Sequence, residues 1–375
     1  MRIGSTAEYE DEAPTCSLGK GGFGVVVKAR HVATVKTVAI KSLRPAAAHD
    51  PDELVREAHF LINASRGNPH VVGFHGLVRH PDTRAFRLAM EYAGPSLRAF
   101  LRDRSERHHP HHKLPEATVR GFMWQLLTGA RTMHARGIVH RDIKPSNVLV
   151  GEDGRTLKFC DLGLAMSLAP DKEPHDPAGT PSYKAPEVLL GKPDYDARID
   201  TWSLGCVMAE MLNGKKLFDG DDDDSDVGEL LAIFAVLGMP DDTTWPGFRS
   251  LPLASSRLPQ LLLRQQRHSR LGELFPDETL SQDGFDVLEG LLTCNPDKRL
   301  TAAAALELPW FAPPRAAQVH AGAMHGAKGL QTETMPPTTA AKKKSILKVP
   351  LTIWNALRTA TRSKTHGRYY RLSSL

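Results

Sequence analysis

The segment IVHRDIKPSNVLV, residues 138–150, contains residue types that could transfer a phosphoryl group. Asp142 could accept the proton of an attacking hydroxyl, and Lys144 could neutralise charge on the transferred group. Asn147, five residues after Asp142, and Asp161 in the later run D-L-G could hold Mg²⁺ through side-chain oxygens. Phosphoryl transfer depends mostly on positioning and charge neutralisation, so one base and two oxygen ligands would suffice.

A glycine-rich run near the N-terminus could bring backbone N–H groups close to phosphates. The run Gly19-Lys-Gly-Gly-Phe-Gly24 has the spacing G-x-G-x-x-G, and glycine lets a backbone approach where a Cβ would hold a phosphate off. Dinucleotide sites use the same letters, but there a helix follows the third glycine. Here VVVKA follows, which predicts a strand. A hairpin over phosphates therefore fits better, and an ordinary glycine-rich hairpin is the alternative.

A lysine and a glutamate sixteen residues apart could complete the phosphate site. Lys41 ends the strand-like run VAIK, and Glu57 lies in a segment with helical spacing of apolar residues. A lysine that contacts phosphates needs a carboxylate to hold its flexible stem. Each residue alone would more often be an ordinary exposed charge, but the order glycine loop, Lys41, Glu57 favours the phosphate site.

The elements that must position these residues change character at Gly94. Before it, β-branched runs predict strands around one helix in PDELVREAHFLINA, residues 51–64. After it, residues 118–137 and 199–214 predict long buried helices, and further helical stretches follow to about Trp310. The predicted fold class is α+β, with a small β-rich lobe followed by a larger helical lobe. Residues 313–341 are rich in Ala, Pro, Gly and Thr and predict a linker.

Composition and charge exclude several classes of protein. No apolar run approaches the roughly 18 residues of a membrane span, and the polar N-terminus does not resemble a secretory signal. The four cysteines have no paired metal spacing, so we expect free thiols and a location in the cytoplasm, the nucleus or both. The net charge of +5 comes from the tail, because residues 315–375 carry +10 and the rest −5. A basic body that would favour nucleic acid is absent.

The chain resembles the eukaryotic protein kinases, on H-R-D-x-x-x-x-N, a D-L-G run nineteen residues after the first Asp, and the triplet Ala185-Pro-Glu187. The resemblance covers about residues 9–312 and implies a two-lobed fold, with an N-lobe at 9–93 and a C-lobe at 94–312 after an extension at 1–8. It implies that Glu187 pairs with Arg299 and that Asp200 supports the catalytic loop. It also implies transfer of the γ-phosphoryl group of MgATP to a protein Ser or Thr.

The resemblance further implies the ATP contacts. Adenine would lie between Val26 and Ala39 above and Leu149 below, with Met90 at the back and the backbone of Glu91 and Ala93 at its edge. The complete set is Leu18, Gly19, Lys20, Gly21, Gly22, Phe23, Gly24, Val25, Val26, Ala39, Lys41, Glu57, Glu91, Ala93 and Leu149. A pseudokinase scaffold, which would bind partners without turnover, is the alternative, although no catalytic residue type is missing.

Within the family, the chain is most similar to cyclin-dependent kinases. The helix around Arg56 and Glu57 resembles their cyclin-contacting helix, which implies a cyclin partner beside the protein substrate. Several positions depart from the pattern: Gly22 and Phe23 replace an inhibitory Thr-Tyr pair, His175 stands where the activating phosphothreonine would, and Met166 replaces one of its arginines. We hypothesise that Glu173 or Asp176 pairs with Arg56 and Arg141 in place of phosphate. The departures also put a preference for proline after the target residue in doubt.

Three other stretches have competing interpretations. The His-rich run 107–112 and the acidic run 221–226 predict solvated loops rather than a metal site or a substrate surface. The tail, residues 342–375, has nine Lys/Arg and no acid, interleaved with apolar residues. It could be a disordered extension, a segment for an import receptor or nucleic acid, or a helix on an anionic membrane surface.

Overall fold

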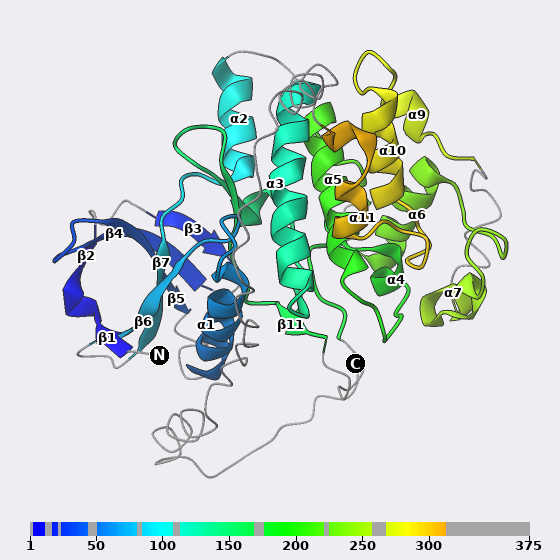
Figure 1. The fold of residues 1–375 in the computed structure, drawn as a ribbon. Coiled ribbons are helices and arrows are strands. Elements are labelled where there is room, and N and C mark those ends of the chain that lie inside the picture. The colour runs from blue at the N-terminus through cyan, green and yellow to red at the C-terminus, as the bar shows by residue number, and fades with distance from the viewer. Residues whose placement is uncertain are drawn as a thin grey trace, which may run out of the picture. The chain divides into compact units, whose positions relative to one another are not determined.

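In the computed structural model, a curled sheet and one helix precede a mostly helical region (Figure 1). The structure describes residues 3–11, 17–21, 24–43, 51–80, 85–107, 113–168, 176–220, 225–256 and 268–312. The predicted linker and tail, the loop residues Gly22 and Phe23, His175, Glu173, and most of the His-rich and acidic runs lie outside these residues. All described residues belong to one compact unit, Met1–Pro314. Among the described residues, no helix is long and apolar enough to cross a membrane.

The N-lobe is a seven-stranded sheet in the order β1-β6-β7-β5-β4-β2, with β3 paired to β4. All pairs are antiparallel except β1 with β6. Its strands are β1 (Ile3–Ser5), β2 (Tyr9–Asp11), β3 (Ser17–Gly21), β4 (Gly24–His31), β5 (Thr37–Leu43), β6 (Phe74–Arg79) and β7 (Phe86–Glu91). The sheet thus begins before residue 9, where we expected the kinase domain to start.

One helix, α1 (Pro51–Ser65), packs against this sheet. Leu54, Ala58 and Leu61 are buried at helical spacing, as their pattern predicts. Asp52 and Glu53 lie in the first turn, where the helix dipole favours acids. The lobe therefore has a fixed helix from which Glu57 can point toward β5.

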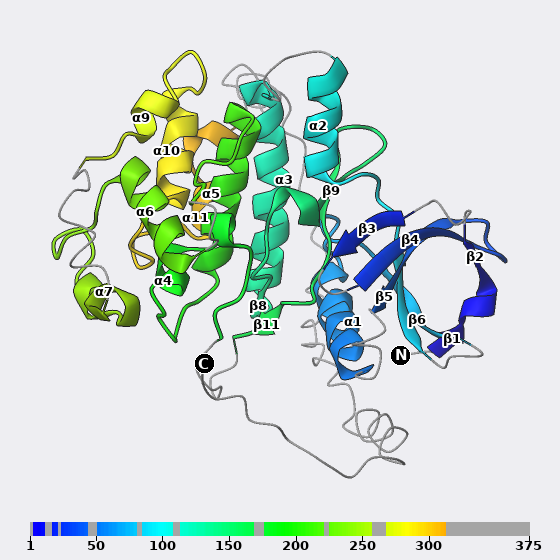
Figure 2. The same cartoon turned by 180° about the vertical axis from the view of Figure 1, so that it is seen from behind.

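The C-lobe is built around two long buried helices, α3 (Glu116–His134) and α5 (Arg198–Asn213), which pack against each other. Thirteen of the sixteen residues of α5 are buried, because other helices surround it (Figure 2). The helices around this pair are α2 (Leu97–Arg107), α4 (Pro186–Leu189), α6 (Asp226–Leu237), α7 (Pro252–Ser256), α9 (Leu271–Leu274), α10 (Gln282–Leu291) and α11 (Ala302–Leu306).

Four short strands at the edge of the C-lobe position the residues that we predicted to be catalytic. Strand β9 (Val148–Val150) pairs with β10 (Leu157–Phe159), and β8 (Ile138–Val139) pairs with β11 (Met166–Ser167). The catalytic loop runs from β8 to β9, and Asp161 follows β10. The two pairings therefore hold the loop and the D-L-G run side by side.

Candidate active site

Three charged side chains from distant parts of the chain meet where the lobes join. The Lys41 Nζ atom, on β5, lies 2.8 Å from both carboxylate oxygens of Glu57 on α1. It also lies 2.7 Å from Oδ1 of Asp161. The side chains of Lys41 and Glu57 are both 5% exposed, whereas that of Asp161 is 33% exposed. The lysine is thus held on one side by a buried acid and on the other by an acid that reaches solvent.

The charges in this triad shift the pKa values of its members in different directions: burial, together with the charge of Asp161, raises the pKa of Glu57 despite the nearby Lys41. Burial lowers the pKa of Lys41, but the carboxylates of Glu57 and Asp161 raise it by more, so the net pKa lies above the usual lysine range. Burial raises the pKa of Asp161, but Lys41, His140 and the Gly163 N–H together lower it by more, which leaves it below its ordinary value. Lys41 is therefore cationic and Asp161 anionic at neutral pH, the state that phosphate and a cation require.

The carboxylate of Asp142 is held by three polar neighbours. The amide of Asn147 donates to Oδ2 of Asp142 at 2.9 Å, and the Lys144 ammonium lies 2.9 Å from the same oxygen. The Thr180 hydroxyl donates to Oδ1 at 2.7 Å, and the Thr180 N–H donates to Oδ1 at 3.1 Å. Lys144 also donates to the Thr180 hydroxyl at 2.6 Å. The Asp142 carboxylate, which we predicted to be the base, is thus fixed in orientation and directly contacts the segment around Thr180.

Asp200, at the start of α5, supports the backbone of the catalytic loop. Its buried carboxylate accepts hydrogen bonds from the N–H groups of His140 (2.8 Å) and Arg141 (2.9 Å) and from the His134 ring (2.8 Å). Arg141 has a φ of 68°, which is uncommon for a residue with a Cβ. The bonds to Asp200 stabilise this conformation, so the predicted supporting role of Asp200 is confirmed.

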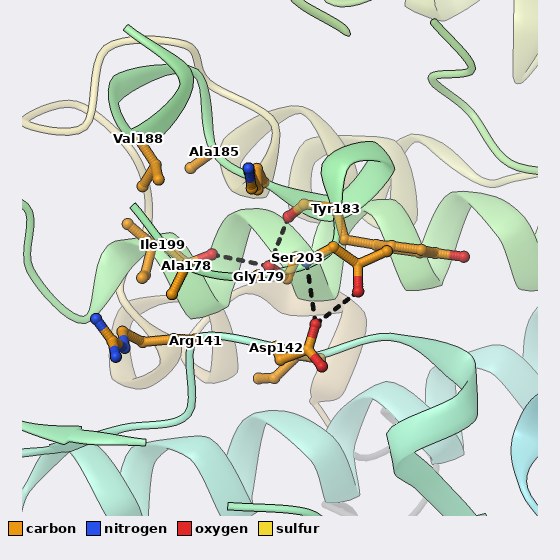
Figure 3. A pocket seen from close by; sticks show the side chains of 12 residues that line it. Arg141, Asp142, Ala178, Gly179, Tyr183, Ala185, Val188, Ile199 and Ser203 are labelled. Atoms are coloured by element: carbon orange, nitrogen blue, oxygen red, sulfur yellow. Dashed lines mark hydrogen bonds between the residues drawn. The ribbon is translucent and has the colours of Figure 1, made fainter. Parts of the chain in front are cut away.

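A small pocket lies beside Asp142 and is closed by the segment 178–185 (Figure 3). In Figure 3 the Asp142 carboxylate points toward this segment, and dashed lines mark its bonds to Thr180. Gly179 has a φ of +112°, and a Cβ there would lie 2.6 Å from the Arg141 carbonyl oxygen. Only glycine allows this close approach of the two segments.

The residues expected around adenine lie on β4, β5, β7 and β9. Ala39 and Met90 are adjacent on paired strands and are both buried, whereas Val26 and Leu149 are half-buried. The carboxylate of Glu91 points away from an adenine role, since it accepts bonds from the Gly73 N–H and from Lys158. The Glu91 N–H donates to the Gly73 carbonyl oxygen at 2.8 Å, and the contact of the Glu91 backbone with adenine stays a prediction. These bonds fix the strand that leads to Ala93.

The side-chain oxygens of Asn147 and Asp161 are of the kind that a hard divalent cation accepts. The Asn147 amide donates both its described bonds through Nδ2, to the carbonyl and the carboxylate of Asp142, which turns its Oδ1 away from that residue. The Cys160 N–H donates to the Asn147 carbonyl oxygen at 3.0 Å, so the backbone directly before Asp161 lies beside Asn147. A carboxylate and an amide oxygen are ligands that Mg²⁺ accepts. In the part of the chain that the structure describes, no cluster of three or more His, Cys, Asp or Glu residues could hold a metal by itself.

Comparison with known proteins decides the family. The profile described as protein kinase domain matches residues 14–311, well over half of the chain. The chain belongs to the protein kinase family. It is 45% identical over 315 residues to cyclin-dependent kinase F-2 of Oryza sativa subsp. japonica, covering 81% of this chain and 92% of that protein.

Two further relatives of this kinase are also cyclin-dependent kinases. Cyclin-dependent kinase B2-1 of Oryza sativa subsp. japonica is 36% identical over 300 residues, which cover 78% of this chain and 87% of that protein. Cyclin-dependent kinase G1 of Arabidopsis thaliana is 35% identical over 308 residues, which cover 78% of this chain but 48% of the longer relative. The chain is accordingly a cyclin-dependent-kinase-like serine/threonine protein kinase, for which ATP and a protein are the substrates.

In the activation segment of this kinase, the described contacts of Arg56 and Arg141 are with backbone carbonyls and a hydroxyl. Arg56 donates to the carbonyl oxygen of Ala165 at 2.7 Å. Arg141 donates to the carbonyl oxygens of Leu164 (2.6 Å) and Asp176 (3.3 Å). The proposed pairing of the Asp176 carboxylate with these arginines is wrong for the described contacts, because the backbone carbonyl of Asp176 takes the bond. Glu173 lies outside the described residues.

The structure brings together the predicted catalytic residues and adds two that the motifs did not reveal. Lys41 meets Glu57, and Asp142, Lys144 and Asn147 meet one another. The two additional residues are Thr180 and Tyr195, whose hydroxyls bond to Asp142 and Arg141. Thr180 lies in the run GTPSYK, three residues before the buried Tyr183, and no sequence signal marked it. No sequence signal marked Tyr195.

Proposed function

We propose that this kinase transfers the γ-phosphoryl group with Asp142 as the base that accepts the hydroxyl proton. The observation that carries the proposal is the convergence of Asn147, Lys144 and Thr180 on one carboxylate. Lys144, which lies between that carboxylate and the Thr180 hydroxyl, would neutralise charge on the moving phosphoryl group. The Lys41 ammonium would bind ATP phosphates while Glu57 holds it in place.

The metal in this proposal is Mg²⁺, held by Asn147 and Asp161. Bound there, it would neutralise the nucleotide phosphates and polarise the transferred group. The hard oxygen donors support it. To test it, binding of ATP to the wild type and to Asp161→Asn is measured by calorimetry with and without Mg²⁺. We expect Mg²⁺ to strengthen ATP binding to the wild type at least tenfold and to leave the variant's affinity nearly unchanged. Equal Mg²⁺ dependence in both would contradict the assignment.

A cyclin is the second proposed partner, through α1. The helix keeps an exposed face that carries Asp52, Glu53, Arg56 and His59, and the relatives are named cyclin-dependent kinases. The test measures phosphate transfer by the purified chain with and without candidate cyclins, on peptides with proline or alanine after the target serine. Stimulation by a cyclin that Glu53→Arg abolishes would support this partner. Full activity of the chain alone, unchanged by every cyclin, would contradict a requirement for one.

The remaining proposals concern the ends of the chain and its location. We keep 313–341 as a linker and 342–375 as a basic tail, whose charge suits an import receptor or an anionic surface. Cytoplasm, nucleus or both is the proposed location. Imaging of the full chain and of a chain without residues 342–375, each fused to a fluorescent protein, tests this. An unchanged distribution after removal of the tail would contradict an import role.

A further inference from the structure

A buried tyrosine ties the activation segment to the catalytic loop. Tyr195, in the loop between α4 and α5, is 4% exposed. Its hydroxyl donates to the carbonyl oxygen of Asp176 at 2.7 Å and accepts a bond from Nη1 of Arg141 at 2.9 Å. The same Arg141 nitrogen lies 3.3 Å from that carbonyl oxygen. Two polar groups, one of them charged, thus donate to the Asp176 carbonyl oxygen and also bond to each other.

These bonds close a ring that contains the catalytic base. Arg141 directly precedes Asp142, and Asp176 lies four residues before Thr180, whose hydroxyl bonds to Asp142. The short stretch between Asp176 and Thr180 includes Gly179, whose backbone lies too close to the Arg141 carbonyl oxygen for a residue with a Cβ. Because so few residues separate the two contacts, a displacement of Asp176 would be transmitted to Thr180 and to the pocket beside it. A displacement of about 1 Å in a positioned group can cost roughly 10²-fold in rate.

The ring of hydrogen bonds among Tyr195, Arg141 and Asp176 contains no phosphate group. Between Ser167 and Thr180 the sequence contains no Ser, Thr or Tyr, so no hydroxyl there could carry one. The guanidinium groups of Arg56 and Arg141 bond to backbone carbonyls and to a neutral hydroxyl. Among the described residues, the acceptors of these bonds are neutral, and the tyrosine hydroxyl supplies a link between Arg141 and the segment.

We propose that Tyr195 is a positioning residue of this kinase, which holds Asp176, and through it the peptide-binding segment 178–185, against the catalytic loop in the absence of phosphorylation. The inference rests on the assignment of Asp142 as the base. It differs from the earlier hypothesis of a substituting acid, because a hydroxyl and a carbonyl perform the anchoring.

The test compares the wild type with Tyr195→Phe, which keeps the buried ring and removes only the hydroxyl. Steady-state transfer is measured with ATP and a synthetic single-serine peptide varied separately. A hydrogen bond to a charged group contributes enough that we expect the peptide KM to rise about tenfold. The ATP KM should stay within twofold, because the triad at Lys41 is untouched. Tyr9→Phe, on the outer strand β2, is the matched control and should leave both constants unchanged.

Two further measurements separate positioning from simple loss of stability. Deuterium uptake of residues 176–185 should rise in Tyr195→Phe while uptake in α5 stays the same, and this readout does not require activity. Phosphatase treatment of the wild type should leave its activity unchanged. The proposal is overturned if the peptide KM and the uptake do not change. It is also overturned if activity falls only with the folded fraction, or if phosphatase abolishes activity.

Discussion

Two buried ion pairs of this kinase have similar chemistry and different surroundings. Arg299 forms two bonds of 2.6 and 2.7 Å to Glu187, and their side chains are 0% and 1% exposed. Its other described donor contacts go to backbone carbonyls, and its guanidinium lies 5.0 Å from the centre of the Trp202 ring. Lys41 and Glu57 are nearly as buried, but Lys41 also contacts Asp161, which reaches solvent.

The difference shows what separates a structural pair from a functional one. The planar guanidinium of Arg299 is enclosed by acceptors on all sides, so a ligand has no access to it. The Lys41 ammonium shares its three donors between two acids, and the more exposed of them, Asp161, reaches solvent. The first pair should therefore determine stability, and the second should determine phosphate transfer.

Of the changes to these two pairs, removal of the functional cation should have the larger effect on rate. In Lys41→Met, kcat/KM should fall about 10²- to 10³-fold, because a preorganised donor to the transferring phosphates is lost. Transfer of labelled phosphate measures it, with Lys192→Met as control, since Lys192 pairs with Asp194 on the surface. A loss of less than fivefold in Lys41→Met would remove the distinction between the two pairs.

Breaking the structural pair should instead lower stability. In Arg299→Met, Glu187 remains buried without its cation, which costs about 3–5 kcal/mol. The unfolding midpoint should fall by roughly 10 °C. At low temperature the folded enzyme should keep its kcat within twofold. Calorimetry and activity measured on the same samples check this, and a large loss of kcat with an unchanged midpoint would assign Arg299 to catalysis.

A third buried carboxylate extends the comparison, and its replacement should have the smallest effect of the three. Glu229, on α6, accepts a bond from the Ser182 hydroxyl rather than from a cation. Burial raises its pKa by more than the neighbouring hydrogen bonds lower it. The folded state therefore holds the proton more tightly than the unfolded chain, so ionisation destabilises the fold as pH rises above the unfolded carboxyl pKa.

In Glu229→Gln the side chain cannot ionise, so the destabilisation caused by a buried negative charge is removed. At pH 8 the variant should be more stable than the wild type by about 1 kcal/mol, a typical contribution of one buried polar group. Near pH 4.5 the difference should vanish. Thermal unfolding of both proteins between these values measures it. An advantage that grows toward acid pH would contradict the assignment.

The motif residues of the site could be predicted from the sequence because each motif is short and local. Asp142, Lys144 and Asn147 lie within one loop, and the strand and helix patterns placed Lys41 and Glu57 on facing elements. The pairing of Glu187 with Arg299, 112 residues apart, came from the family resemblance and is confirmed. The strands around the glycine loop and the two long helices also follow their predicted patterns.

The contacts that the sequence did not reveal depend on tertiary placement. Thr180 lies 38 residues from Asp142, and Tyr195 lies 54 residues from Arg141. Nothing local distinguishes these hydroxyls from others in the chain. We predicted that the Asp176 carboxylate would pair with arginines, and this was wrong. The prediction rested on the type of side chain, whereas the contact is made by a backbone carbonyl, which every residue has. Strand β1 was likewise missed, since three residues carry too little pattern.

The central claim is that Asp142 accepts the proton of the attacking hydroxyl, and Asp142→Asn tests it most directly. An asparagine keeps the shape and an acceptor oxygen for Thr180, but it cannot take the proton. Transfer of labelled phosphate from ATP to a serine peptide should fall about 10³-fold, within the usual range for loss of a general base, while ATP affinity by calorimetry stays within threefold. Transfer by the variant at close to the wild-type rate would contradict the account.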